Sequence, residues 1–249
     1  MELELWVYAA LFAVAVFAGT IDAIAGGGGL LVLPALLLAG VPPLTALGTN
    51  KFQGLFGSGS ASFAFWQMGH LDLQKWGGIA LLCATTSAFG AFVASILPIS
   101  TLNLIVPFCM ILLALYFLFK PNFDAERRPI LPLGVIAFLF VPLVGFYDGI
   151  FGPGAGSFYM AVFVGLGGIT ILTATAQTKL VNFASNVGGF LIFALIGSIA
   201  WKLGLLMAIG QLIGGRIGAG FAIRRGERLI RPLLVVMSLA MAVRLLFGG

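Results

Sequence analysis

An aspartate followed by a glycine-rich stretch occurs twice in this sequence, each time interrupting a long apolar run. The two stretches read Asp22-Ala-Ile-Ala-Gly26-Gly27-Gly28-Gly29 and Asp148-Gly149-Ile-Phe-Gly152-Pro-Gly154-Ala-Gly156-Ser157. Glycines that break an apolar helix leave backbone N–H groups at the start of the next half-helix, where they can bind an anion. The pattern therefore predicts anion binding at the two breaks, with close packing of small residues as the alternative.

One lysine follows each break, Lys51 and then Lys179, and each again lies in an apolar run. A charged side chain costs about 3 kcal/mol or more at the centre of a bilayer, so these lysines and the two aspartates must face the protein interior and be paired. Two interpretations remain open. The pairs are purely structural, or the lysines attract an anion while Asp22 and Asp148 couple its movement to protons.

Polar residues surround each lysine at helical spacing. They are Thr49, Asn50, Gln53, Ser58 and Ser60 in the first half, and Gln177, Thr178, Asn182, Ser185 and Asn186 in the second. Such a face can line a cavity for an oxyanion or supply hydrogen bonds between helices. The predicted substrate-binding residues are Gly26, Gly27, Gly28, Gly29, Thr49, Asn50, Lys51, Gly152, Gly154, Gly156, Ser157, Gln177, Lys179, Asn182 and Asn186.

The composition is that of a multi-pass membrane protein. Of the 249 residues, 61% are hydrophobic and only 8% are charged, and the mean hydropathy is +1.14. In a soluble domain about a quarter of the residues carry charge. The net charge of +5 comes from basic residues in short loops, which a membrane explains better than nucleic acid. One histidine and two separated cysteines do not match the ligand spacing of a zinc or iron–sulfur site, so we expect no metal and no cofactor.

We predict an all-α fold with broken helices and about 8 to 10 membrane segments. Helices are expected over residues 5–25, 30–39, 44–68, 76–97 and 102–119 in the first half, and over 130–151, 158–166, 169–196, 203–222 and 230–247 in the second.

The two halves align as an internal duplication. Asp148 follows Asp22 by 126 positions, and Lys179 follows Lys51 by 128, so the copies stay in step apart from a two-residue insertion. We therefore divide the chain into a first repeat over residues 1–119, a cytoplasmic hinge over 120–129 and a second repeat over 130–249.

The relation between the repeats depends on whether the short segments after the breaks cross the bilayer. If they cross, each half has five segments, the second half is inverted, and the basic loop residues gather on one side except for Lys202. This distribution favours inverted repeats, in which the aspartate of one half pairs with the lysine of the other. If the short segments only re-enter, each half crosses four times and each aspartate pairs with the lysine of its own half.

Three motifs resemble the TauE/SafE sulfite exporter family, also called the sulfonate uptake and export permeases. They are Asp-Ala-Ile-Ala-Gly-Gly-Gly-Gly-Leu-Leu from Asp22, Thr-Asn-Lys from Thr49, and Gly-Phe-Tyr-Asp-Gly-Ile-Phe-Gly-Pro-Gly-Ala-Gly-Ser-Phe from Gly145. The resemblance covers nearly the whole chain. It implies a bacterial inner-membrane transporter that exports a small sulfur-containing or organic anion, such as sulfite or sulfoacetate, coupled to protons by alternating access.

Two other functions are the alternatives, a passive anion channel and an intramembrane enzyme. We expect no enzyme, because the nucleophile-like Gly57-Ser58-Gly59 has no evident basic partner except Lys51, and the one histidine, His70, lies in a loop. The expected partners are the anion and the lipid bilayer, without nucleic acid. The oligomeric state is left open, a homodimer included.

Overall fold

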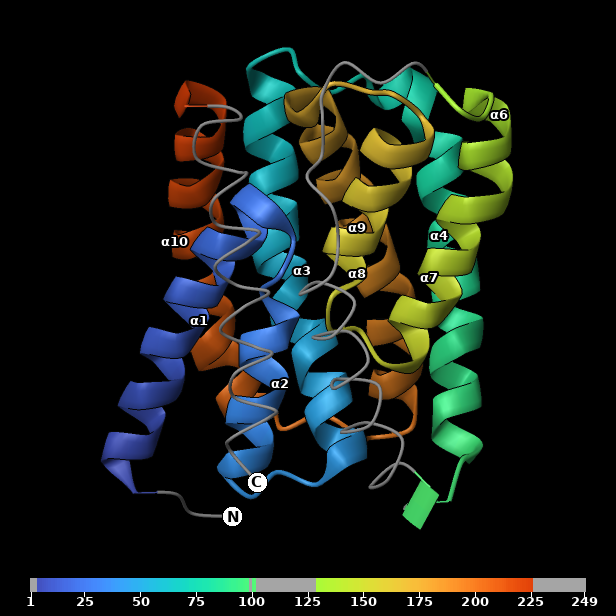
Figure 1. Ribbon diagram of the computed structural model, residues 1–249. Helices are drawn as coiled ribbons and strands as arrows, with labels where there is room; N and C mark the ends of the chain where they lie inside the picture. The colour runs from blue at the N-terminus through green and yellow to red at the C-terminus, as the bar shows by residue number, and fades with distance from the viewer. Residues whose placement is uncertain (1–3, 99, 102–128, 226–249) are drawn as a thin grey trace, which may run out of the picture.

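The computed structural model describes residues 4–98, 100–101 and 129–225, and every regular element in this part of the chain is a helix (Figure 1). The first half contains α1 (Leu5–Ala25), α2 (Gly29–Leu38), α3 (Pro43–Gln67) and α4 (Leu73–Ile96). The second contains α6 (Leu133–Val135), the π-helix η1 (Ile136–Phe140), α7 (Val141–Ile150), α8 (Ala155–Met160), the π-helix η2 (Ala161–Leu166), α9 (Ile171–Leu195) and α10 (Trp201–Arg225). The all-helical prediction is confirmed. The predicted helices over 102–119 and 230–247, and residues 120–128 of the predicted hinge, lie outside the described residues.

Five of the described helices are long and apolar enough to cross a membrane: α1, α4, the continuous helix Leu133–Ile150, α9 and α10. This agrees with the predicted membrane class. Large apolar side chains such as Phe17 of α1 and Phe89 of α4 are each 60% exposed, as expected of a surface that faces lipid. Helix α3 is equally long but more polar, and its polar residues are largely buried.

The two lysine-bearing helices, α3 and α9, pack against each other and run in opposite directions (Figure 1). Figure 1 shows the same opposition between α1 and α7 and between α4 and α10. Helix α10 packs along α1 and α3, whereas α4 packs along α7 and α9. Helix α10 of the second half therefore packs within the first half, helix α4 of the first half packs within the second, and the two halves interlock.

Three predicted helix starts differ from the structure by three residues, and local backbone chemistry explains two of them. Helix α4 begins three residues early because the Asp72 carboxylate caps it, accepting hydrogen bonds from the N–H groups of Gln74 and Lys75. Helix α8 begins at Ala155 instead of residue 158 because Gly154, with a φ of 79°, turns the chain directly into the helix. The helix predicted from residue 130 begins at Leu133, α10 extends to Arg225 instead of residue 222, and the remaining described ends lie within two residues of the prediction.

Small residues let helices of the two halves approach closely. A Cβ on Gly218 of α10 would overlap the carbonyl oxygen of Thr20 in α1, and one on Gly90 of α4 would overlap that of Phe146 in α7. Gly90 and Gly218 occupy equivalent positions in the duplication, and so do Thr20 and Phe146. The same close contact between halves is therefore made twice.

Gly90→Val should lower the thermal unfolding temperature of the purified protein by about 5 °C, because a side chain overpacks the α4–α7 contact at a cost of about 1–3 kcal/mol. Gly78→Val is the matched control in the same helix, since a Cβ there would meet no atom within 4 Å. Its melting temperature should stay close to that of the wild type. Equal losses in both variants would contradict the packing role of Gly90.

Candidate functional site

The two glycine breaks lie against each other. A Cβ built on Gly26 would lie 2.5 Å from the carbonyl carbon of Gly156, and one built on Gly156 would lie 2.6 Å from the carbonyl oxygen of Gly26. No larger residue fits at either position without moving the backbone. The contact sets the C-terminal end of α1, which Gly26 caps, against the start of α8, and a Cβ on Gly29 at the start of α2 would lie 3.2 Å from Pro153 Cα in the second break. The first residues of a helix carry N–H groups without partners inside the helix and a partial positive charge.

Each buried lysine pairs with the aspartate of the other half. Lys51 Nζ lies 2.5 Å from Asp148 Oδ1, and Lys179 Nζ lies 3.1 Å from Asp22 Oδ2. Both lysines are at most 1% exposed, which requires a partner of opposite charge. This is the pairing expected of the inverted arrangement, and the alternative pairing within each half is not found for these four described residues.

The surroundings of the two pairs differ. The carboxylate of Asp148 is 2% exposed and also accepts a hydrogen bond from Ser185 Oγ. The carboxylate of Asp22 is 15% exposed and accepts a hydrogen bond of 3.1 Å from the backbone N–H of Gly28. Lys179 Nζ donates a further hydrogen bond to the backbone carbonyl of Asp22. Asp22 therefore connects a buried lysine to the first glycine break.

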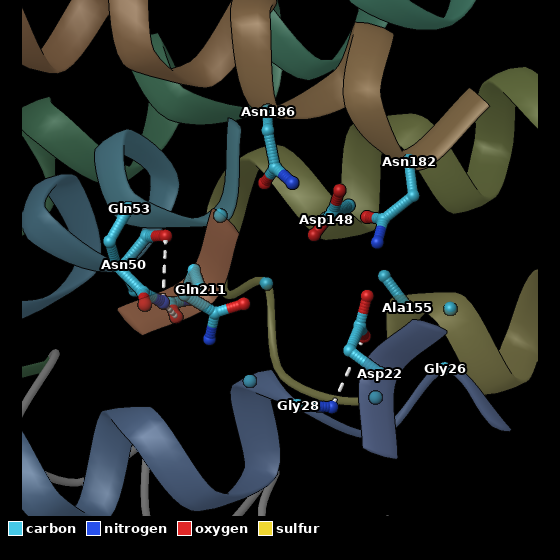
Figure 2. Close-up of a pocket in the computed structure, with 15 residues that line it drawn as sticks. Asp22, Gly26, Gly28, Asn50, Gln53, Asp148, Ala155, Asn182, Asn186 and Gln211 are labelled. Carbon is cyan, nitrogen blue, oxygen red and sulfur yellow. Dashed lines mark hydrogen bonds between the residues drawn. The ribbon is translucent and has the colours of Figure 1, made fainter. Parts of the chain in front are cut away.

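A small polar cavity lies where the breaks meet (Figure 2). Its lining comes from α1, α3, α7, α8, α9, α10 and both breaks, and consists of Asp22, Gly26, Gly28, Gly29, Asn50, Gln53, Gly54, Asp148, Gly152, Gly154, Ala155, Gly156, Asn182, Asn186 and Gln211. Figure 2 shows the amides of Asn50, Gln53 and Gln211 on one side of this space and the carboxylate of Asp22 on the other. A concave site with several convergent polar groups is typical of a small polar ligand.

Most of the predicted site residues line this cavity, and six do not. Those six are Gly27, Thr49, Lys51, Ser157, Gln177 and Lys179. The two lysine ammonium groups are bound to the aspartates, so carboxylates and not ammonium groups reach the cavity. Ser157 Oγ donates a hydrogen bond of 3.2 Å to the carbonyl oxygen of Gly26 and so links the two breaks.

Four lining residues were missing from the predicted set: Gln53, Gly54, Ala155 and Gln211. Gln53 belongs to the polar face around Lys51 that the sequence shows. Gln211 had a weaker signal, a single amide within the apolar, glycine-rich stretch that forms α10. Its side chain reaches inward because Gly19 leaves room for it, since a Cβ on Gly19 would lie 2.9 Å from Gln211 Oε1.

Hydrogen bonds orient the amides of α3. Gln53 Nε2 donates to Asn50 Oδ1 at 3.0 Å, and Asn50 Nδ2 then faces both breaks. That nitrogen lies 3.6 Å from a Cβ built on Gly29 and 3.1 Å from one built on Gly152. Gln53 Oε1 is buried with no hydrogen-bond partner in the described part of the chain. A buried acceptor of this kind is uncommon, and a ligand or a water molecule would satisfy it.

The family model described as sulfite exporter TauE/SafE matches residues 11–245, a span that includes both breaks and all four buried charges. The chain belongs to the TauE/SafE family. Its transporter character, predicted from the motifs, is thereby confirmed at the level of the family.

Relatives of this TauE/SafE protein are named as transporters. The probable membrane transporter protein ORF9 of Sinorhizobium is 49% identical over 98% of this chain and 94% of its own length. The probable membrane transporter protein YfcA of Escherichia coli K12 is 42% identical, covering 96% of this chain and 89% of its own. A probable membrane transporter protein of Haemophilus influenzae is 39% identical, covering 99% and 97%. No solved structure matches the chain.

Lys51→Met in this TauE/SafE protein should destabilise the fold by about 3–5 kcal/mol, because it leaves Asp148 buried and unpaired. The double variant Lys51→Met/Asp148→Asn removes both charges and should recover much of that loss. Thermal unfolding of the wild type, both single variants and the double variant in one detergent measures the coupling. A double variant that loses as much as the two single variants combined would contradict the ion pair.

Proposed function

We propose that this protein is a secondary transporter that exports a small anion, such as sulfite, sulfoacetate or another organic anion, coupled to protons by alternating access. The observation that carries the proposal is the polar cavity at which the two glycine breaks meet. Membership of the TauE/SafE family and the names of the relatives support transport rather than catalysis.

The cavity chemistry suits a small anion. Helix N-terminal ends supply N–H donors and favour negative charge by about 0.3–1 kcal/mol each, and by more when buried. The amides of Asn50 and Asn182 add side-chain donors at the same place. Because each aspartate is matched by a lysine, the site carries no excess negative charge that would repel the anion. An oxyanion can accept hydrogen bonds from several of these donors at once.

Inverted repeats provide the basis for alternating access. In support, the equivalent helices α1 and α7, α3 and α9, and α4 and α10 run in opposite directions (Figure 1), and both ion pairs cross between the halves. Helix α2 returns the chain to the end of the bundle at which α1 begins (Figure 1), as a five-segment repeat requires, although its ten residues span only about 15 Å. The two repeats then move against each other around the central site.

The sidedness follows from the basic residues at the helix ends. The first turn of α4, with Lys75, and the last turn of α10, with Arg224, lie at the same end of the bundle (Figure 1). The first turn of α10, with Lys202, lies at the opposite end. By the positive-inside rule we assign the end with Lys75 to the cytoplasm, and we propose the bacterial inner membrane as the location, as the family resemblance implies.

Proteoliposomes containing the protein should transport radiolabelled sulfite or sulfoacetate faster when a pH gradient is imposed. Asn50→Ala removes a donor from the cavity, and we expect the flux to fall about tenfold. Gln74→Ala, at an exposed position at the start of α4, is the control and should transport like the wild type. If neither anion moves in the wild type, the proposed substrates are wrong. If Asn50→Ala transports normally, the cavity lies outside the transport path.

Cysteine labelling tests the inverted repeats. Lys75 and Lys202 are both exposed, so a cysteine at either position is open to a reagent on its own side of the membrane. Lys202→Cys should react with a membrane-impermeant maleimide in intact cells, whereas Lys75→Cys should react only after permeabilisation. The wild type, with its native cysteines, measures the background. Equal reaction of both variants in intact cells would place the two positions on the same side and exclude the arrangement.

A further inference from the structure

We propose that Asp22, and not Asp148, couples this protein to protons, because the Asp22 carboxylate occupies the N-terminal end of α2 that the transported anion requires. Protonation of Asp22 releases the N–H group of Gly28 for the anion, so one proton and one anion bind and cross the membrane together. Export by this route is driven by an outward gradient of the anion that exceeds the inward proton gradient. The inference rests on the proposed function, and it specifies which of the two duplicated aspartates acts and by what contact.

Asp22 holds the place of an anion at the first break. Its Oδ1 accepts a 3.1 Å hydrogen bond from Gly28 N–H, while its Oδ2 lies 3.1 Å from Lys179 Nζ. An oxyanion at the start of a helix makes charge-assisted contacts of the same kind. Gly29 begins α2, so its N–H group has no acceptor within the helix. A bound anion and the ionised Asp22 carboxylate therefore compete for one set of donors.

Polar groups beside this position point to a ligand. Gln53 lines the same cavity, is 1% exposed, and has an Oε1 atom without a partner among the residues described. Its Nε2 holds Asn50 Oδ1, which turns Asn50 Nδ2 toward Gly29. An oxyanion that carries a hydroxyl group, or one that arrives with a water molecule, would accept from Asn50 and donate to Gln53.

Asp148 lacks such an exchangeable contact. Its two carboxylate oxygens are bound to Lys51 and Ser185, and no N–H group of the second break, which the structure describes in full, donates to it. Asp148 is also the one hydrogen-bond acceptor of the Lys51 ammonium group in the described chain. Protonating Asp148 would therefore leave the Lys51 ammonium group buried without a counter-charge, with only a neutral carboxyl group as its partner, which is strongly unfavourable.

Lys179 is better placed. It donates to the backbone carbonyl of Asp22 as well as to the carboxylate, so a second acceptor remains beside the neutral carboxyl group, and the bound anion supplies the counter-charge. The Asp22 carboxylate is also more accessible, at 15% exposure against 2% for Asp148. The two ion pairs thus have different roles. The Asp22–Lys179 pair exchanges a proton, and the Asp148–Lys51 pair stabilises the fold.

Charge balance gives the stoichiometry. With both pairs ionised the site is neutral, and a monovalent anion added to it would leave one negative charge buried without compensation. When Asp22 is protonated, the positive charge of Lys179, just outside the cavity, balances that of the anion and the site is neutral again. One proton therefore accompanies each monovalent anion.

The other titratable groups around Asp22 do not take its place as the group that binds the proton. Lys179 of α9 and Asp148 of α7 are the charged groups that face it, and Asp148 is itself paired with Lys51 of α3. Helix α2 contains no charged residue, and the titratable residue of α8 is Tyr159, which is fully buried. The described charged side chains of α10, the helix packed along α1, are exposed.

Calorimetric binding of methanesulfonate, whose charge is constant at mildly acidic and mildly alkaline pH, tests the inference. For the wild-type protein in nanodiscs, the affinity for the anion should fall by up to about tenfold for each unit by which the pH rises. The protein should take up one proton for each anion that it binds, which is measured by titration in buffers of different ionisation enthalpy. Asp22→Asn should bind with the same affinity at every pH and take up no proton. Asp148→Asn, the control at the equivalent position, should keep the pH dependence in its folded fraction, with a lower melting temperature.

The outcomes separate the inference from the proposed function. Binding to the wild type without proton uptake, or proton uptake that persists in Asp22→Asn, overturns the role of Asp22 and leaves the anion site standing. Proton uptake that disappears only in Asp148→Asn assigns the coupling to the other half and also overturns it. If neither methanesulfonate nor sulfoacetate binds to the wild type at any pH, the proposed anion function fails together with the inference.

Discussion

Two lysines buried within a membrane protein require two buried partners of opposite charge, and the rest of the structure depends on that requirement. Lys51 and Lys179 belong to α3 and α9, which pack against each other, and their partners belong to α1 and α7. Because each pair crosses between the halves, neither half neutralises its own charge. The halves are interdependent for electrostatic reasons as well as through their interlocked packing.

The two halves resemble each other more closely in the contacts between their helices than in the residues that they place at the cavity. Gly19 packs against Gln211 in α10, and the equivalent Gly145 packs against the equivalent Cys83 in α4. Gln211 reaches the cavity, whereas Cys83 is buried against the hydroxyl of Tyr159 at 2.9 Å. The same backbone approach therefore presents an amide to the cavity in one half and a packing residue in the other. A site built by two related halves is in this way asymmetric, which allows the two ion pairs to take different roles.

The cavity also shows why glycine recurs at the breaks. Helix ends buried inside a bundle must either satisfy their N–H groups or present them to a ligand. The Gly26–Gly156 contact sets the C-terminal end of α1 against the start of α8 at a distance that no side chain permits. One of the exposed donors, Gly28 N–H, is occupied by Asp22, so a protein carboxylate stands where an external anion would otherwise bind.

The sequence by itself determined the membrane class, the positions of the breaks, nearly all described helix ends, and the identity of the four charges that must be buried. These properties are local, because they depend on hydropathy, on glycine and proline, and on the cost of a charge in hydrocarbon. The tertiary structure decided which aspartate meets which lysine, that carboxylates rather than ammonium groups reach the cavity, and that Gln211 joins it. Each of these depends on how helices far apart in the sequence are placed against each other, and the spacing of charges along the chain allowed both pairings.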